Sequence, residues 1–311
     1  MSEPLQPSPS FLAASALAAL LAAGGCDMAK ETLRADFADY NAILQANQSE
    51  QLLLNLVRIH YRESPMFLQA GTLTASYENS FSGGPQATLQ QGDQSLVGVS
   101  GSYTFSAKPT ISYSPIEGKD YVQQFMTEIS PQTFGMLVRA RWPIGKLAGL
   151  LVERVVLPDG TQLLGMHDSP TRDAFLAFFR DLEANEERGQ LLVVFRKDGG
   201  VDLKTPERTI GVESFQLRSL FSAMFVAAHD VETPASQAAW TKPGPKSGAL
   251  SVRATEKPPA DALVCVQYAG WHYSVARDDI ATKDMLALLL ELHRIQAGPP
   301  AAAPLLTIPA R

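Results

Sequence analysis

The chain has few cysteines and no excess of positive charge. Only Cys26 and Cys265 occur in 311 residues, so we expect no disulfide framework. Lys and Arg number 26 against 32 Asp and Glu, which gives a formal net charge of −6. A protein that binds nucleic acid through its phosphates needs a basic surface, which this balance does not favour. We therefore expect no nucleic-acid partner.

Residue patterns that carry chemistry are also scarce. None of the five histidines has a second histidine four residues away, the spacing that places two metal ligands on one helical face. The sequence contains neither a Gly-x-Ser-x-Gly elbow nor a phosphate-binding glycine loop. His167, Asp168 and Ser169 have the residue types of a hydrolase triad, but neighbours in one loop do not normally aim at one another. We expect no metal, no cofactor and no catalytic residues, and hence no enzyme.

An uncharged stretch rich in Ala and Leu runs from Phe11 to Gly25, and Cys26 and a charged segment up to Asp36 follow it. As a helix this stretch would extend for only about 22 Å, less than the roughly 30 Å of a bilayer's hydrocarbon core. It ends in small residues, as a signal cleavage site requires. The pattern predicts a cleaved signal segment over residues 1–25, an anchor linker over 26–36 and a single domain over 37–311.

Ala23-Gly24-Gly25-Cys26 resembles the lipobox of bacterial lipoproteins. The resemblance implies that the Cys26 thiol carries lipid and that the signal is removed directly before it. The protein would then be lipid-anchored in the bacterial cell membrane and face the periplasm. The pattern departs from the usual one at Ala23, where leucine is common, and in residues 1–10, which lack Lys and Arg. Asp27 favours the inner membrane, as in enteric bacteria, and leaves the outer membrane open.

Apolar periodicity predicts an α+β domain in which helices pack on a mainly antiparallel sheet. We expect helices in residues 31–63 (two pieces), 118–129, 131–141, 144–156, 171–187, 212–229 and 280–296. Pro131 and Pro143 are expected in the first turns of the helices at 131–141 and 144–156. A hairpin is expected over 191–204, strands over 262–275, and a surface loop over 232–259 with a short strand at 250–253. The expected core includes Leu53, Leu56, Val57, Trp271, Leu288, Leu289 and Leu292.

Residues 66–114 alternate apolar residues with small or hydroxyl-bearing ones, a period of two that predicts strands. Val97, Val99 and Tyr103 fall on one face of such a strand, while Ser82-Gly83-Gly84-Pro85 predicts a break between strands. A strand pair of this kind can extend the sheet of a partner or of a second copy by backbone pairing. The alternative is an ordinary hairpin that the following helices cover.

Arg58 and Arg62 lie four residues apart in a predicted helix. This spacing brings two side chains to one face, where together they would bind an anion or a lipid phosphate. Pairing with an acid such as Glu63 is the alternative. The candidate interaction surface therefore comprises Val97, Val99, Tyr103, Arg58 and Arg62.

Residues 49–68 have the sequence SEQLLLNLVRIHYRESPMFL, a long pattern. Shorter patterns lie at residues 108–118, at 268–273 with the helix that follows, and at 304–309. In these four segments the chain resembles an uncharacterised family of bacterial lipoproteins. The family usually has two acids directly after the third strand, whereas here Ser274 to Arg277 precede Asp278. The resemblance implies an envelope location and one fold, and it implies no activity.

These patterns together predict a lipid-anchored bacterial envelope lipoprotein that acts as a binding or assembly component of a membrane-associated complex. The expected partners are the membrane, through the lipid, and an envelope protein or a second copy. One alternative is a lipid- or small-molecule-binding protein, if the strand around Trp271 lines a cavity. The other is an envelope hydrolase, if a cleft joins His167 or His272 to a serine or a carboxylate.

Overall fold

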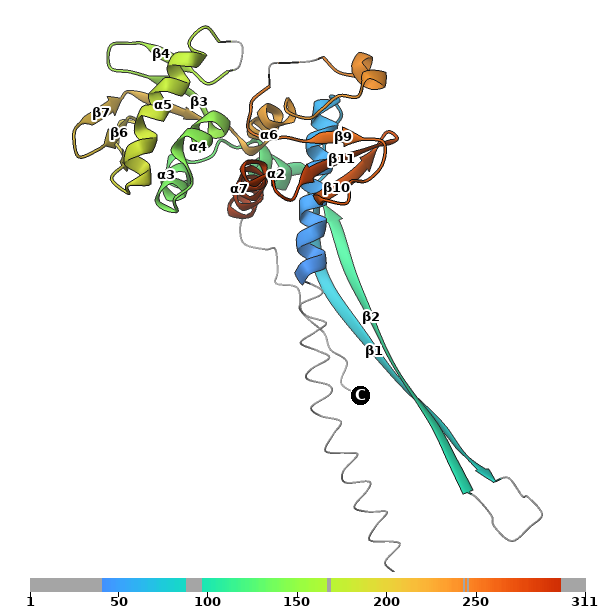
Figure 1. Cartoon of the computed structure of the whole chain (residues 1–311). Helices are drawn as coiled ribbons and strands as arrows, with labels where there is room; N and C mark the ends of the chain where they lie inside the picture. Colours follow the sequence, from blue (N-terminus) through green and yellow to red (C-terminus); the bar gives the residue numbers. More distant parts are fainter. Residues whose placement is uncertain (1–40, 88–96, 167–168, 243, 245, 298–311) are drawn as a thin grey trace, which may run out of the picture.

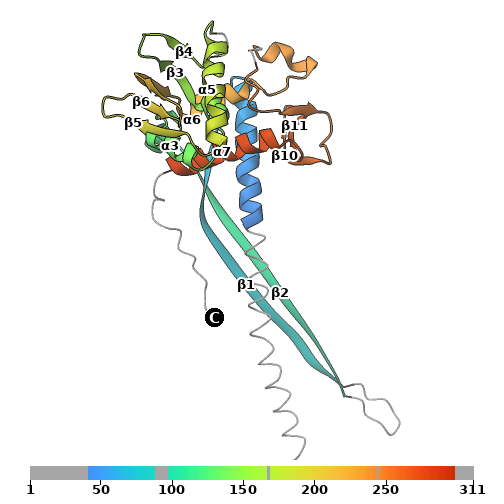
Figure 2. The same ribbon diagram turned by 60° about the vertical axis from the view of Figure 1, so that its left-hand side comes forward.

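The chain forms a body of helices and small sheets, from which one long β-ribbon projects (Figure 1). The computed structural model describes residues 41–87, 97–166, 169–242, 244 and 246–297. The predicted signal segment, Cys26, the pair His167-Asp168 and the motif at 304–309 lie outside these residues. The ribbon points away from the body in a second orientation as well (Figure 2).

The first helix that the structure describes, called here the N-terminal helix, covers residues 41–60. Leu53, Leu56 and Val57 recur at helical spacing and are fully buried. Two helical pieces were predicted over 31–63. The described part is one continuous helix, because neither Gly nor Pro interrupts the sequence between residues 41 and 60.

Arg62 lies just beyond the last turn of the N-terminal helix, with a left-handed φ of 63°. Its N–H donates to the Ile59 carbonyl at 3.0 Å, and the Glu63 N–H donates to the Arg58 carbonyl at 2.8 Å. These two hydrogen bonds are those of a Schellman motif, which ends a helix by turning the chain away. The prediction that Arg58 and Arg62 share a helical face is therefore wrong.

The ribbon consists of β1 (Leu68–Ala87) and β2 (Val97–Pro115), which pair antiparallel. The strands predicted over 66–114 are confirmed. The predicted break at Ser82-Gly83-Gly84-Pro85 is wrong, because these residues continue β1 and pair with residues 99–102 of β2. Glycine and proline are tolerated here because the strand has an open edge, where a missing N–H breaks no ladder hydrogen bond.

After the ribbon the chain forms α2 (Gly118–Tyr121), the π-helical turn η1 (Val122–Met126), α3 (Pro131–Arg139) and α4 (Ile144–Leu151). Ser130 caps α3, since its Oγ accepts a hydrogen bond from the Thr133 N–H at 3.0 Å. Pro131 occupies the first turn of α3, as predicted. Pro143 was predicted in the first turn of α4, but it is the N-cap residue that precedes this turn.

The helix predicted over 144–156 is wrong in its second half, where Val152–Val156 form β3. Valine is branched at Cβ, which favours strands over helices, and three of these five residues are valine. β3 is the middle strand of a sheet with β4 (Gln162–Leu164) and β8 (Ser214–Leu217). Buried Arg218 donates to the Gly149 and Leu150 carbonyls at 3.3 and 3.0 Å, which satisfies acceptors that the end of α4 leaves free.

The helix predicted over 171–187 is confirmed as α5 (Arg172–Glu187), and the hairpin over 191–204 as β5 (Leu192–Phe195) and β6 (Val201–Lys204). β7 (Thr209–Val212) adds a third strand to this sheet. The helix predicted over 212–229 is wrong at its start. β8 comes first, Ser219 then serves as an N-cap, and α6 covers Leu220–Ala228.

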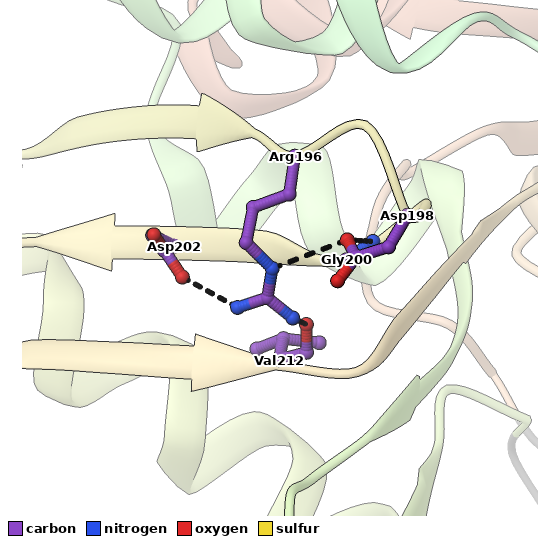
Figure 3. A network of polar contacts seen from close by, with 5 residues as sticks. All are labelled: Arg196, Asp198, Gly200, Asp202 and Val212. Atoms are coloured by element: carbon purple, nitrogen blue, oxygen red, sulfur yellow. Dashed lines mark hydrogen bonds and ion pairs between the residues drawn. The ribbon is translucent and has the colours of Figure 1, made fainter.

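A charged network closes the β5–β6 hairpin (Figure 3). Arg196 donates to the carboxylate of Asp202 at 2.6 Å, to that of Asp198 at 3.2 Å and to the Val212 carbonyl at 3.1 Å. Asp198 also accepts a hydrogen bond from the Gly200 N–H at 3.0 Å. This N–H and the Arg196 guanidinium lower the pKa of the Asp198 carboxyl. The network ties three strands together and is a structural feature of the turn.

The segment 232–259 contains the 3₁₀ helix η2 (Ala235–Trp240) and β9 (Arg253–Thr255), so the short strand begins three residues later than predicted. β10 (Ala262–Tyr268) and β11 (Trp271–Ala276) form the strand pair predicted over 262–275. α7 (Ile280–Gln296) has the predicted bounds. Asp279 caps it by accepting hydrogen bonds from the N–H and the hydroxyl of Thr282 at 3.0 and 2.7 Å.

Short antiparallel sheets alternate with helices, which confirms the predicted α+β class. The prediction of a single sheet on which the helices pack is not confirmed. The described strands form four sheets, ordered β1-β2, β10-β11-β9, β4-β3-β8 and β5-β6-β7. Buried apolar residues of the N-terminal helix, α3 to α7 and the three-stranded sheets form one cluster. Trp271 is only half-buried, whereas the other six predicted core residues are buried, namely Leu53, Leu56, Val57, Leu288, Leu289 and Leu292. Over the ranges that the structure describes, no helix combines the length and the apolar character needed to cross a membrane.

Candidate functional site

The ribbon separates apolar from polar residues by register. In an antiparallel pair, directly opposite residues share a face, and successive residues of one strand alternate between faces. Leu73 is opposite Ile111, and Phe81 is opposite Tyr103. The register therefore defines what we call the apolar face: Leu73, Ala75, Tyr77, Asn79, Phe81, Gly83, Pro85, Ala87, Val97, Val99, Gly101, Tyr103, Phe105, Ala107, Pro109 and Ile111.

The opposite face, called here the polar face, consists mainly of serine and threonine. Glu78 and Lys108 are its only charged residues over this stretch. The full set is Thr74, Ser76, Glu78, Ser80, Ser82, Gly84, Gln86, Gly98, Ser100, Ser102, Thr104, Ser106, Lys108 and Thr110. The two faces thus differ in polarity along almost the whole ribbon.

Both outer edges of the ribbon are open. Pro85 and Pro109 lie on the apolar face and have no N–H, so they occupy positions that make no hydrogen bond across the ribbon. Because bonded and non-bonded pairs alternate, the other residues of the apolar face also direct their backbone groups outward. Within the described sheets, no third strand pairs with β1 or β2. Each edge therefore offers a row of backbone donors and acceptors to another strand.

The base of the ribbon is held on the N-terminal helix by Asn55, whose side chain is fully buried. Its Nδ2 donates to the Met66 carbonyl at 2.8 Å, and its Oδ1 accepts from the Met66 N–H at 3.0 Å. Nearer the start of the helix, Asn47 donates to the Tyr113 hydroxyl at 3.0 Å. Sequence reasoning missed the role of Asn55. The signal was present, because a polar residue stood within an apolar helical face in the motif at 49–68.

A pocket of about 250 Å³ lies at this base, between the N-terminal helix, the first residues of the ribbon, η1 and α7. Phe125 stacks on Phe67 and on the His293 ring, with centroid distances of 4.0 and 5.1 Å. Burial lowers the pKa of His293. The Gln124 Oε1 and the His293 Nδ1 have no hydrogen-bond partner among the described residues. The pocket therefore suits a small, mainly apolar ligand with one or two polar atoms.

Arg62 and Arg58 line different hollows. The Arg62 guanidinium lies 4.8 Å from the centroid of the Phe225 ring, in a pocket of about 270 Å³ that Lys242 and Lys246 also line. Arg58 donates to the Asn55 Oδ1 at 3.3 Å and faces a separate hollow beside Cys265. The two arginines thus do not form one anion site. The predicted alternative partner, Glu63, accepts a hydrogen bond from the Tyr268 hydroxyl at 2.6 Å.

His60 borders the Arg62 pocket, and both of its ring nitrogens make hydrogen bonds. Its Nδ1 is 2.9 Å from the Ala228 carbonyl and its Nε2 is 2.7 Å from the Thr233 hydroxyl. A carbonyl only accepts, so Nδ1 carries the proton and Nε2 of the neutral ring accepts from Thr233. Burial lowers the pKa of His60, which favours this neutral form. His60 is thereby held in place and is not free to act as a base.

A buried tyrosine cluster joins the end of the N-terminal helix to the β10–β11 hairpin. The Tyr61 hydroxyl lies 2.6 Å from that of Tyr273 and donates to the Gln237 Oε1 at 2.5 Å. Tyr273 also donates to this oxygen at 2.9 Å, and the Gln237 Nε2 donates to the Ala269 carbonyl at 3.0 Å. Burial raises the pKa of Tyr273, so its hydroxyl stays protonated at neutral pH. The three oxygens share two hydroxyl protons, so each takes part in a hydrogen bond within the cluster, which serves as a structural joint.

The described residues do not assemble the hydrolase triad considered from the sequence. The His272 Nδ1 lies 3.2 Å from the backbone carbonyl of Glu256, and the Ser169 Oγ contacts Thr171. His167 and Asp168 lie outside the described residues. Among the described residues, no three His, Cys, Asp or Glu side chains gather in a cluster that could hold a metal ion.

Comparison with known proteins yields no relative for this chain. No protein-family model matches it, no curated protein matches it, and no solved structure matches its fold. The resemblance of the four sequence segments to a lipoprotein family therefore stays a prediction.

Proposed function

We propose that the chain is a lipid-anchored bacterial envelope lipoprotein and that it acts as a binding or assembly component of a membrane-associated complex. Lipid on Cys26 would tether the body at the periplasmic surface of the membrane. The sequence around Cys26 supports the anchor. The observation that carries the assembly role is the β-ribbon, which extends away from the body with two open edges (Figure 2).

A ribbon of two strands is marginally stable in water when it stands alone. Natural proteins blunt exposed edges with charges, prolines or short strands, because open edges recruit other strands. In the amphipathic stretch of this ribbon, two charged and two proline residues are spread over about thirty positions, and the strands run for 20 and 19 residues. Pairing with strands of another chain would satisfy the edges and stabilise the ribbon.

Co-purification of the tagged, full-length protein from detergent-solubilised membranes tests the assembly role. We expect the wild type to elute as a complex and Val99→Lys to lose its partners, because a charge then stands on the apolar face. Ser100→Lys is the matched control, since Ser100 is the next residue and lies on the polar face. Near-ultraviolet circular dichroism of Trp142, Trp240 and Trp271 reports whether the body remains folded. An intact complex from folded Val99→Lys would show that assembly does not require an uncharged apolar face.

The anchor has a separate test, Cys26→Ser. We expect mass spectrometry of the N-terminal peptide to find lipid on Cys26 in the wild type, and the serine variant to remain unprocessed and to leave the membrane fraction on carbonate washing. Normal processing and membrane attachment of Cys26→Ser would overturn the lipoprotein assignment.

A second candidate function is binding of a lipid or another small molecule in the pocket at the ribbon base. The unpartnered Gln124 Oε1 favours it, because a buried acceptor without a donor costs free energy that a ligand would recover. Trp271 packs against the core, which does not support a cavity at its strand. Mass spectrometry of organic extracts from the purified wild type and from Gln124→Leu would reveal such a ligand as a species that the variant lacks.

A further inference from the structure

Among the described residues, no third strand pairs with the ribbon that carries the apolar face. The ribbon runs away from the body in both views, and no other helix or strand of the described residues lies alongside its far half (Figures 1 and 2). An uncovered apolar surface of this extent usually marks a contact with another molecule or with lipid.

We infer that the apolar face of the ribbon lies against the acyl chains of a lipid bilayer. From Leu73 to Ala87 the face extends for about 45 Å at roughly 3.3 Å per residue, which exceeds the roughly 30 Å of a hydrocarbon core even with some tilt. None of its sixteen positions is charged, and Asn79 is its only polar side chain apart from tyrosine hydroxyls. Alternation of apolar with polar residues over stretches of this length is the pattern of strands that contact lipid on one side only.

Two kinds of protein cover, a partner domain and a second copy of this chain, fit the apolar face less well than lipid does. A domain of about 100 residues has a radius of gyration near 13 Å, so one such domain would leave much of a face about 45 Å long uncovered. Two copies stacked face to face would cover both apolar faces but would leave all four strand edges unpaired. Lipid covers the face without competing for the edges.

The inference rests on the proposed function, because strands cannot remain in lipid with unpaired backbone groups. Strands from other chains must pair with the edges of β1 and β2 while lipid covers the apolar face. The polar face, with its hydroxyl groups and the opposite charges of Glu78 and Lys108, would then lie on the side away from lipid.

The test compares neighbouring positions on the two faces in the full chain. Single cysteines replace Val99, Tyr103 and Phe105 on the apolar face, and Ser100, Ser102 and Ser106 on the polar face. Each variant carries Cys265→Ala, is labelled with an environment-sensitive fluorophore and is reconstituted in vesicles of phosphatidylethanolamine and phosphatidylglycerol. A second set of vesicles contains phospholipids with a nitroxide quencher on the acyl chain. A thiol left free at Cys26 would be labelled equally in all six variants and would not alter the difference between the faces.

We expect quenching by the nitroxide lipid to be severalfold stronger at the three apolar-face positions than at the three polar-face positions. Equal or absent quenching at both faces would overturn the inference. A blue-shifted emission at the apolar positions without lipid quenching would also overturn it, because protein would then be the cover. The particle size in detergent, measured on the same samples, separates the two proposals. If the particle has the size of a complex but lipid does not quench the fluorophore, only the lipid contact is refuted. If the particle has the size of a monomer and lipid does not quench, the proposed assembly is refuted as well.

Discussion

At the scale of single residues, the Asp230 side chain holds a turn together through five hydrogen bonds. Its buried carboxylate accepts hydrogen bonds from the backbone N–H groups of four successive residues, 247 to 250, and from the Ser247 hydroxyl. Asp230→Ala would remove the buried carboxylate that accepts from all of these donors. We expect the free energy of unfolding in urea to fall by about 3 kcal/mol or more. Glu232→Ala, which removes one exposed bond to the Ala254 N–H, should cost below about 1 kcal/mol. Equal losses in both variants would contradict the role given to Asp230.

His293 makes stability depend on pH. Burial lowers its pKa in the folded chain below the usual 6.5, and the nearby Arg294 adds to the shift. Between the lowered pKa of the folded chain and about pH 6.5, His293 binds a proton in the unfolded chain but not in the folded chain. The stability contribution is thus complete above about pH 6.5 and is lost as the pH falls toward the folded-state pKa. His60 shifts in the same direction.

We therefore expect the urea midpoint of the wild type to be lower at about pH 5.5 than at about pH 7.5. His293→Phe keeps a ring beside Phe125 and removes the titrating group, so its midpoint should change less between the two values. An identical pH dependence in the variant and the wild type would show that His293 does not contribute.

At the scale of elements, the N-terminal helix is the support of the ribbon. It buries Leu56 completely against the core, while Ile43 on the same helix is 48% exposed. Leu56→Ala should lower the free energy of unfolding by about 2–5 kcal/mol, because a close-packed site relaxes only partly around the cavity. Ile43→Ala should change it by no more than about 0.5 kcal/mol. Chemical denaturation measures both, and a loss below about 0.5 kcal/mol for Leu56→Ala would show that this face does not pack in the core.

At the scale of the whole molecule, the ribbon and the body should be separable. A variant in which Asn-Gly replaces residues 75–109 joins Thr74 to Thr110, which are opposite each other in a hydrogen-bonded pair, through a tight turn. We expect its melting temperature to stay within about 4 °C of the wild type, since beyond its base the ribbon extends away from the body and its strands pair only with each other among the described strands (Figures 1 and 2). The complex with partners should be lost. Failure of the shortened body to fold would show that the ribbon contributes to its core.

Long, regular patterns in the sequence were sufficient to predict several elements. α7 was predicted with its bounds, because Asp279 marks its start and apolar residues recur through the helix. The alternation along residues 66–114 predicted the strands of the ribbon, and with it the shared face of Val97, Val99 and Tyr103. These elements follow from local sequence because each repeats one periodicity over many residues.

Tertiary structure decided the short elements and the candidate sites. Val152 of β3 pairs with Leu217 of β8, so each strand exists because the other lies beside it, and either segment alone also fits a helix. Arg62 and Arg58 diverge because Arg62 is itself the left-handed residue that follows the end of the helix. Tyr61, Gln237 and Tyr273 meet only through the packing of distant segments. Short-range periodicity carries no information on such contacts, because their free energy comes from burial and hydrogen bonds between residues far apart in the chain.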